Sequence, residues 1–389
     1  MSKKFKLGLI GKIVIGIILG VFIGKFFPHG FVRIFVTFSS IFGNFLGFII
    51  PLLIIGFVTA GIAELGTGAG KLLGITVAIS YGFTLISGVF AYGVGTTLLP
   101  KIITSDAAKN IATGGEGLEH FFTIEMTPIM GITSALVLAF ILGLGISATK
   151  SEGLKKIAFE FQNIISKTIE SVIIPLLPVH IVGIFANMTV SGQVSTIFSV
   201  FWKVFLIVII CHYIIILFQF FIGAGVSNRN VFKCIKYEIP GYMTALGTQS
   251  SAATIPVNIN CSEKMGISKS IRDFVIPLCA TTHMSGSTIT LSLCAMSVMM
   301  LYGMPFNFPT FFAFVAMLGV SIVAAPGIPG GAVMASLPVL ELILGFDKPM
   351  LSLMIALYIA QDSFGTACNI TGDQAVAMIV DTIKSKLKL

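Results

Sequence analysis

The chain has 389 residues, of which 56% are hydrophobic and only 10% are charged, and its mean hydropathy is +1.01. No soluble globular domain has this composition, and the apolar runs lack the alternation of a membrane β-barrel. The sequence therefore predicts an all-α polytopic membrane protein. The net charge of +8 lies largely at span ends and at the two ends of the chain, so it indicates topology and not a nucleic-acid partner. By the positive-inside rule, both termini are expected in the cytoplasm of a cell-membrane protein with an even number of crossings.

The first 236 residues contain six apolar segments, each long enough to cross a bilayer as a helix. They are expected at 7–27, 34–64, 72–99, 128–149, 155–188 and 195–226. The first is expected to be a retained helix, since no small-residue cleavage site is evident after it. Residues 101–120 are polar and contain glycine, so an exposed connection is expected there.

The six cysteines all lie in the second half of the chain, mostly within apolar runs, and none forms a CxxC pair. We interpret them as small buried apolar residues, so neither a disulfide framework nor a thiolate metal site is expected.

After residue 236, two apolar segments are interrupted by small, polar or helix-breaking residues. The first segment contains GTQSSAAT at 247–254, and the second contains AAPGIPGG at 324–331. Longer apolar segments follow them, at 274–302 and 350–380, so the second half contains one pattern twice. Paired broken segments in corresponding positions indicate the binding site of a transporter. We expect each break to turn back inside the membrane as a re-entrant hairpin, and two proline-kinked complete crossings are the alternative.

The last predicted helix carries a polar stripe within QDSFGTACNITGD at 361–373. Asp362, Thr366, Asn369 and Asp373 are spaced i, i+4, i+7 and i+11, which places them on one face. An ionisable side chain at bilayer depth costs about 2.5–3.5 kcal/mol on insertion scales, so two on one stripe indicate a function. We interpret the stripe as part of a site for a small polar solute and a cation. A hydrogen-bond network that only joins helices is the alternative.

The broken segments differ in the groups that they can offer a ligand. The hydroxyls and free N–H groups of the first break suit a carboxylate, whereas the second break offers backbone carbonyls, which suit a dehydrated Na⁺. Between them, TTHMSGST at 281–288 predicts local unwinding around Gly286. His283 in this stretch is a proton carrier, a substrate ligand or a packing residue.

Four motifs, in order, resemble those of the dicarboxylate/amino acid:cation symporter family, which are glutamate-transporter-type carriers. They are SSAATIPV at 250–257, the Met-x-Gly core of HMSGST at 283–288, GIPGG at 327–331 and DSFGTACNITGD at 362–373. The resemblance extends over nearly the whole chain and is greatest to the bacterial serine/threonine sodium symporters.

This resemblance implies eight transmembrane helices plus two re-entrant helical hairpins, arranged as inverted repeats in a homotrimeric elevator-type transporter. Residues 1–236 would form mostly the scaffold and the trimer contacts, with part of the transport domain. Residues 237–389 would form the transport core, made of hairpin, helix, hairpin and helix.

The resemblance also implies a substrate site and two sodium sites. Ser251, Asn369 and the N–H groups of the first hairpin would bind the substrate α-carboxylate, while Asp362 and Thr366 would bind the α-amino group. The full substrate-binding set is Ser250, Ser251, Met284, Ser287, Ile328, Gly330, Asp362, Gly365, Thr366 and Asn369. The sodium ligands, through side chains or carbonyls, would be Cys279, Thr281, His283, Val323, Ala325, Asn369 and Asp373.

The chain departs from the acidic-substrate members of this family at several positions. Gly365 stands where those members have an arginine in the last helix, and Gln249 where some relatives have one. A second substrate carboxylate would then lack its bidentate partner. His283 and Ser285 replace the Asn and Asp of the family's Asn-Met-Asp-Gly motif, which removes a carboxylate assigned to a further sodium ion.

We therefore expect Na⁺-coupled symport of a small neutral amino acid that resembles serine, threonine or alanine. The alternatives within this fold are an acidic amino acid or dicarboxylate as substrate, and protons as some or all of the coupling ions. An ion channel is the alternative from another class. No enzyme is expected, because Asp362 and Asp373 are three helical turns apart, too far for a shared-proton dyad.

Overall fold

The computed structural model describes residues 9–66, 71–104, 117–323 and 330–387, and all regular secondary structure within these ranges is helical. The all-α prediction is therefore confirmed. The helices of the first half lie close to the predicted segments. They are α1 (Leu9–Phe26), α2 (His29–Leu53), α3 (Thr59–Gly66), α4 (Lys71–Ile102), α6 (Ile132–Thr149), α7 (Glu152–Thr168), α8 (Ile174–Val190) and α9 (Val194–Val226). Single π-helical segments, η1 (Ile54–Val58) and η2 (Ile169–Ile173), continue α2 into α3 and α7 into α8.

The second half consists of shorter helices that end in one long helix. They are α10 (Val231–Thr248), α11 (Ser251–Lys264), α12 (Lys269–Thr282), α13 (Ser285–Leu301), α14 (Phe308–Val323), α15 (Gly331–Leu344) and α16 (Lys348–Leu387). The helix expected at 274–302 is therefore two helices, which are separated at His283 and Met284. The second predicted interruption separates α14 from α15, although residues 324–329 lie outside the described part of the chain.

Six helical runs in the described chain are long and apolar enough to cross a membrane. They are His29–Ala63, Lys71–Ile102, Glu152–Val190, Val194–Val226, Lys269–Leu301 and Lys348–Lys386. Two further apolar helices, α1 and α6, have 18 residues each. The structure thus supports a polytopic membrane protein, while the expected number of eight crossings stays a prediction.

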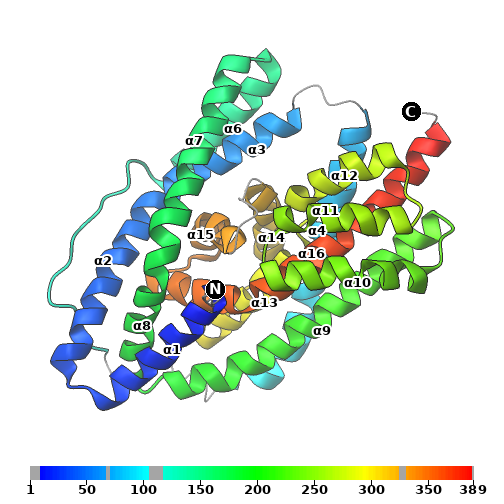
Figure 1. Ribbon diagram of the computed structural model, residues 1–389. Helices are drawn as coiled ribbons and strands as arrows, with labels where there is room; N and C mark the ends of the chain where they lie inside the picture. The colour runs from blue at the N-terminus through cyan, green and yellow to red at the C-terminus, as the bar shows by residue number, and fades with distance from the viewer. Residues whose placement is uncertain (1–8, 67–70, 105–116, 324–329, 388–389) are drawn as a thin grey trace, which may run out of the picture.

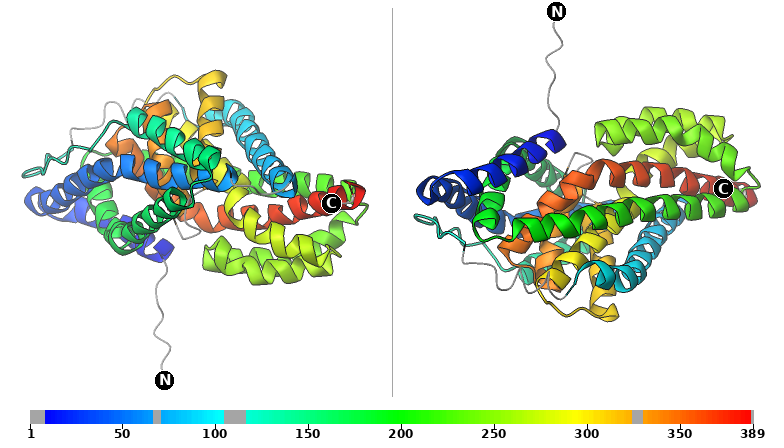
Figure 2. Two further views of the ribbon diagram at one scale, coloured as in Figure 1. Left: turned by 90° about the horizontal axis from the view of Figure 1, so that it is seen from above. Right: turned by 90° about the horizontal axis from the view of Figure 1, so that it is seen from below.

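The helices are arranged in two groups around α16 (Figure 1). One group contains α1–α3 and α6–α8, and the other contains α4 and α9–α13. Helix α16 runs from the first group into the second, where it packs against α9, α10, α12 and α13. Viewed from below, it lies between α9 and the α10–α11 pair (Figure 2). Most of the polar residues of α16 are consequently buried among helices from both halves of the chain.

Glycine allows close helix contact within the first group. Gly16, Gly20 and Gly24 form a stripe on α1 that faces the backbone of α8, where a Cβ would overlap the carbonyl oxygens or neighbouring atoms of α8. Small residues at this spacing let two membrane helices approach closely. The outer surface of α9 is apolar and exposed, with Trp202 and Ile210 among its residues, as expected for a helix in contact with lipid.

Candidate functional site

The site is organised by the break between α12 and α13. His283 has extended backbone dihedral angles, and α13 begins two residues later. The first amides of α13 are capped from another helix, since Asn369 Oδ1 accepts hydrogen bonds from Gly286 N at 2.7 Å and Ser287 N at 3.2 Å. The helix is therefore interrupted within the stretch 281–288 where unwinding was expected, at His283 and Met284 and not at Gly286 itself. Gly286 lies in the first turn of α13, where its missing side chain allows close contact with the backbone of Gly365.

His283 joins this break to α16. Its Nδ1 lies 3.0 Å from Asp373 Oδ1 and 3.0 Å from the carbonyl oxygen of Asn369. On the other side of the ring, Nε2 lies 2.8 Å from Ser285 Oγ and 3.2 Å from Gln219 Nε2. All of these side chains are buried. His283 is thus a hydrogen-bonded connection between three helices and not an isolated packing residue.

The surroundings of Asp373 fit a small cation. Its second oxygen, Oδ2, is buried and accepts no hydrogen bond, and neither does the buried Oε1 of Gln219. Free carboxylate and carbonyl oxygens of this kind are the groups that bind a dehydrated Na⁺. In the described chain, no three His, Cys, Asp or Glu side chains gather as they would around a transition metal.

The other predicted sodium ligands contribute differently. The carbonyl oxygen of Cys279 accepts the His283 amide at the end of α12. Thr281 is exposed, and its hydroxyl donates to the carbonyl of Leu278. Val323 is the last residue of α14, and Ala325 lies outside the described residues.

Asp362 connects α16 to the start of α15. Its Oδ2 accepts a 2.7 Å hydrogen bond from the amide of Gly330, the residue that precedes α15. Gly330 has a φ angle of 78°, in the left-handed region that glycine adopts without strain. Asp362 Oδ1 lies 3.5 Å from the hydroxyl of Thr366, and the hydroxyl of Tyr358 also lies beside this carboxylate. One oxygen of this buried carboxylate therefore binds the start of α15, while hydroxyl groups of α16 lie beside the carboxylate.

A small hydroxyl cluster lies beside Asp362. Ser287 Oγ accepts hydrogen bonds from Asn369 Nδ2 and from the hydroxyl of Tyr358, both at 2.9 Å. Met284 Sδ is 3.5 Å from the same Asn369 nitrogen. Tyr358 is fully buried one turn before Asp362 on α16. The cluster contains hydrogen-bond donors and acceptors and one carboxylate.

The α10–α11 pair packs against α16. Gln249 has a φ angle of 55°, and Ser250 caps α11 by accepting a 3.2 Å hydrogen bond from Ala253 N. Ser251 is buried as the first residue of α11. Asn258 fixes the pair to α16 through a 3.0 Å hydrogen bond to the carbonyl of Ile370.

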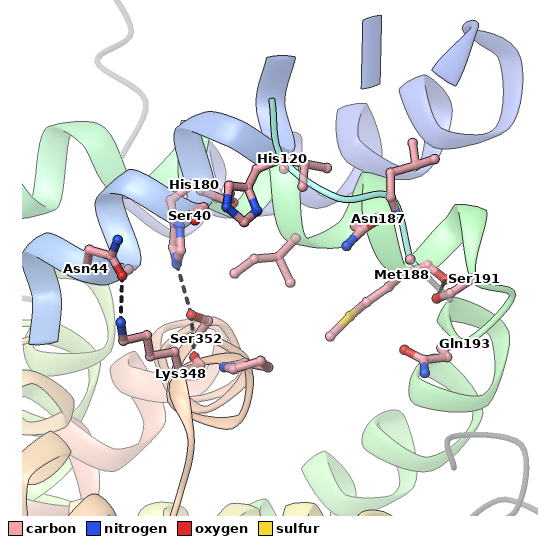
Figure 3. A pocket seen from close by; sticks show the side chains of 18 of the residues that line it. Ser40, Asn44, His120, His180, Asn187, Met188, Ser191, Gln193, Lys348 and Ser352 are labelled. Carbon is pink, nitrogen blue, oxygen red and sulfur yellow. Dashed lines mark hydrogen bonds between the residues drawn. The ribbon is translucent and has the colours of Figure 1, made fainter. Parts of the chain in front are cut away.

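A polar pocket of about 400 Å³ lies elsewhere, between α2, α8 and the beginning of α16 (Figure 3). Ser352 in its wall precedes Asp362 by ten residues, which is about 15 Å along a helix. His180 Nε2 lies 3.1 Å from Ser352 Oγ, and Lys348 donates to Asn44 (Figure 3). This pocket therefore lies where the first helix group meets the beginning of α16, and it is not part of the Asp362 cluster.

Comparison with known proteins identifies the kind of molecule. The model of the sodium:dicarboxylate symporter family matches residues 9–383. The chain belongs to this family.

The chain is similar to the serine/threonine transporter SstT of Acinetobacter baumannii (strain AYE), with 25% identity over 366 residues, 88% of this chain and 90% of that protein. The corresponding transporter of Streptococcus agalactiae serotype III (strain NEM316) is 26% identical over 357 residues, 86% of each chain. The resemblance seen in the motifs is confirmed, and the protein is a membrane transporter, not an enzyme.

Two residues of the candidate site were not anticipated from the sequence. Gln219 and Tyr358 both bond directly to predicted site residues, Gln219 through His283 and Ser285 and Tyr358 through Ser287. A glutamine inside an apolar span is one available signal for the first. Tyr358 lies four residues before Asp362, on the same helix face, which is a signal for the second. Ile328 of the predicted substrate set falls outside the described residues.

Gly372→Ala is expected to damage this site because α16 has no space for a side chain there. The added Cβ would overlap both His283 and Gln219, which are buried. Forcing a methyl group into a packed interior costs about 1–3 kcal/mol. We expect a lower thermal unfolding midpoint in detergent and reduced uptake in proteoliposomes. Gly82→Ala in α4 is the matched control, since nothing lies within 4 Å of its added Cβ. Wild-type stability and uptake in Gly372→Ala would show that the His283–Gln219 contact is not rigid.

Proposed function

We propose that this symporter imports a small neutral amino acid, such as serine, threonine or alanine, together with Na⁺. The observation that carries the proposal is the buried carboxylate of Asp362, which forms no ion pair with a lysine or arginine in the described part of the chain. Residues 274–340 contain no charged side chain, and Lys348 precedes Asp362 by fourteen residues, about 21 Å along α16. The site thus offers one anion for a substrate ammonium and no cation for a second substrate carboxylate.

The substrate would be held through its backbone groups. Its ammonium would pair with Asp362 Oδ1 and Thr366, while Oδ2 keeps the Gly330 amide. Its carboxylate would bind the tip of the α10–α11 pair at Ser250 and Ser251, together with Asn369. Met284, Ser287, Gly365, Gly330 and Ile328 would complete the pocket. The absence of an arginine at Gly365 argues against a dicarboxylate, in spite of the family's name, and the relatives named as serine/threonine transporters support this choice.

Sodium is the proposed driving ion. Asp373, with the carbonyls of Asn369 and Cys279, would hold one Na⁺ next to His283. Carbonyls near Thr281 and in the second hairpin, at Val323 and Ala325, would hold another. Transport would follow an elevator movement, in which residues 237–389 slide against a scaffold formed mostly by residues 1–236 in a homotrimer. The hydrogen bond between His180 and Ser352 would have to break during such a movement.

The proposed membrane topology has eight crossings and two re-entrant hairpins. In each of the consecutive pairs α10–α11 and α14–α15, the two helices are short and pack against each other. This arrangement supports the two hairpins. Both termini would lie in the cytoplasm, with the protein in the cell membrane.

Uptake into proteoliposomes tests the proposal. An inward Na⁺ gradient should drive saturable accumulation of labelled serine, threonine or alanine above the external concentration. An ion channel would conduct without accumulating the amino acid. Uptake of aspartate or glutamate at a similar rate would refute the neutral substrate class. Accumulation driven by a proton gradient alone would refute sodium coupling.

Gly365→Arg is expected to change the substrate preference. An added Cβ at Gly365 meets its nearest atoms, Thr290 Oγ1 and Ser287 N, at 3.5 and 3.6 Å, which is ordinary contact. The guanidinium would take up side-chain space and provide a fork for a carboxylate. We expect weaker serine uptake and measurable aspartate inhibition, determined by competition in proteoliposomes. Gly365→Ala is the control and should retain serine uptake. Equal serine affinity in Gly365→Arg and wild type would place Gly365 outside the pocket.

A further inference from the structure

Basic side chains gather at the end of the molecule where α16 finishes. The connection from α9 to α10, the turn between α11 and α12 and the last turns of α16 lie together there (Figure 1). Hydrogen bonds join the three segments, because Arg229 donates to the carbonyl of Gly266 at 2.9 Å and to Asp381 Oδ2 at 2.8 Å. The hydroxyl of Ser268 donates to Asp381 Oδ1 at 2.6 Å. Charges that are distant in the sequence therefore share one surface.

The surface acids at this end pair with arginines and leave the lysines unpaired. Arg229 pairs with Asp381 at 2.8 Å. Arg272 pairs with Glu263 at 2.8 Å and lies 3.9 Å from Asp273. Six lysines form what we call the basic surface, and no ion pair in the described parts of the chain includes them: Lys233, Lys236, Lys264, Lys269, Lys384 and Lys386. Five of the six are exposed, and the other is half-buried.

The charge balance at this end goes beyond what membrane topology explains. Eight basic side chains accompany three surface acids here, whereas residues 150–170, which include α7, contain four lysines and three glutamates. The positive-inside rule accounts for lysine and arginine beside membrane spans but gives little weight to acids. The scarcity of acids among the lysines of the basic surface is therefore a separate feature, and it favours an anionic partner.

An exposed apolar stripe on α10 adjoins the basic surface. Phe232, Ile239 and Met243 are 72%, 54% and 57% exposed. Together with Lys236 they are spaced i, i+4, i+7 and i+11, so one face of α10 carries all four side chains. The rings of Phe232 and of Phe221 on α9 pack edge to face, with their centroids 6.4 Å apart. The stripe thus continues the apolar outer surface of α9 as far as the lysines.

We propose that this region binds an anionic phospholipid of the surrounding membrane, with its phosphate against Lys233 and Lys236 and its acyl chains along the stripe of α10. The phosphate supplies the negative charge that the lysines lack, and the acyl chains cover apolar side chains that water would otherwise contact. The hydrocarbon part of Lys236 can lie on the stripe while its ammonium group reaches the headgroup. A soluble phosphate would meet the lysines alone. The proposal does not depend on the transported substrate or on the coupling ion.

Binding of matched lipids to the detergent-purified full-length protein tests this inference. Phosphatidylglycerol and phosphatidylcholine with the same acyl chains differ in net charge, and glycerol 1-phosphate carries a charged phosphate without the chains. Native mass spectrometry from an uncharged detergent measures the apparent affinity of each. We expect phosphatidylglycerol to bind at least about tenfold more tightly than either, because each lysine near an anionic lipid contributes about fivefold. Equal binding of the two lipids, no binding of lipid, or equally tight binding of glycerol 1-phosphate would overturn the proposal.

Matched variants locate the lipid. Lys233→Gln combined with Lys236→Gln should lower the phosphatidylglycerol affinity at least about tenfold and leave the phosphatidylcholine affinity unchanged. Lys156→Gln combined with Lys167→Gln, at exposed positions of α7, removes the same charge and should change neither affinity. Phe232→Ser should weaken the binding of both lipids, since it removes an exposed ring from the stripe. An equal loss in the two double variants would show that net charge, and not the basic surface, attracts the lipid, and would overturn the proposal.

Discussion

Replacing Asp362 by asparagine is expected to abolish amino-acid uptake while the protein stays folded. Asparagine keeps an oxygen that can accept the Gly330 amide, which is bonded at 2.7 Å in the wild type, so the start of α15 stays capped. The counter-charge of the substrate ammonium is lost. Removing one partner of a buried charged pair costs about 2–5 kcal/mol. This corresponds to a loss of affinity of about 30-fold to several thousand-fold.

Serine binding by the purified protein and uptake in proteoliposomes measure this loss. Asp347→Asn is the matched control, because Asp347 is exposed at the beginning of α16 and caps Met350 N at 2.9 Å. Asparagine can make the same cap, so binding and uptake should be unchanged there. If Asp362→Asn binds serine as well as the wild type does, Asp362 does not bind the amino group.

Asp373→Asn is expected to remove the dependence of uptake on sodium. Asparagine can still accept the hydrogen bond from His283 through one oxygen, so the break between α12 and α13 keeps its position. The buried Oδ2, which has no hydrogen-bond partner, loses its share of the negative charge. Uptake at zero and at saturating Na⁺ measures the effect. Asp273→Asn, at a half-exposed aspartate of α12, is the control and should keep the wild-type response. If sodium still stimulates uptake in Asp373→Asn, the sodium site does not include Asp373.

The energetic consequence of one sodium ion is large. An ion that moves down a potential of about 100 mV contributes about 2.3 kcal/mol. A tenfold concentration gradient adds about 1.4 kcal/mol, so each coupled ion can raise accumulation by several hundredfold. Ser285 bonds to His283 and Gln219 at the position where glutamate-type relatives have a carboxylate. We therefore expect one coupled sodium fewer than in those relatives.

The reversal potential of substrate flux in proteoliposomes measures this number at set Na⁺ gradients. Repeating it with a proton gradient reveals whether a proton takes the place of the missing ion. A pH-independent stoichiometry equal to that of the glutamate-type relatives would show that Ser285 and His283 do not alter the coupling.

The positions of many helices followed from the sequence because the hydrocarbon of a membrane permits few backbone structures. A chain segment in hydrocarbon must satisfy its own N–H and C=O groups, so an apolar run of sufficient length becomes a helix. The segments expected at 7–27, 72–99 and 195–226 therefore correspond closely to α1, α4 and α9. The positions of the two interrupted segments followed from glycine, proline and hydroxylated residues, which weaken a continuous helix.

The sequence by itself determined that this is a helical membrane transporter of the symporter family, with a polar stripe on its last helix. Only the tertiary structure decided which groups that stripe contacts. His283 and Asp373 are 90 residues apart, and Gln219 and His283 are 64 apart, yet both pairs bond in one buried cluster. The tertiary structure also decided that the helix breaks at His283 and Met284, because Asn369 of α16 caps the first turn of α13. Local sequence could not predict this, since a polar group buried in a helical membrane protein finds its partner on whichever distant helix packs against it.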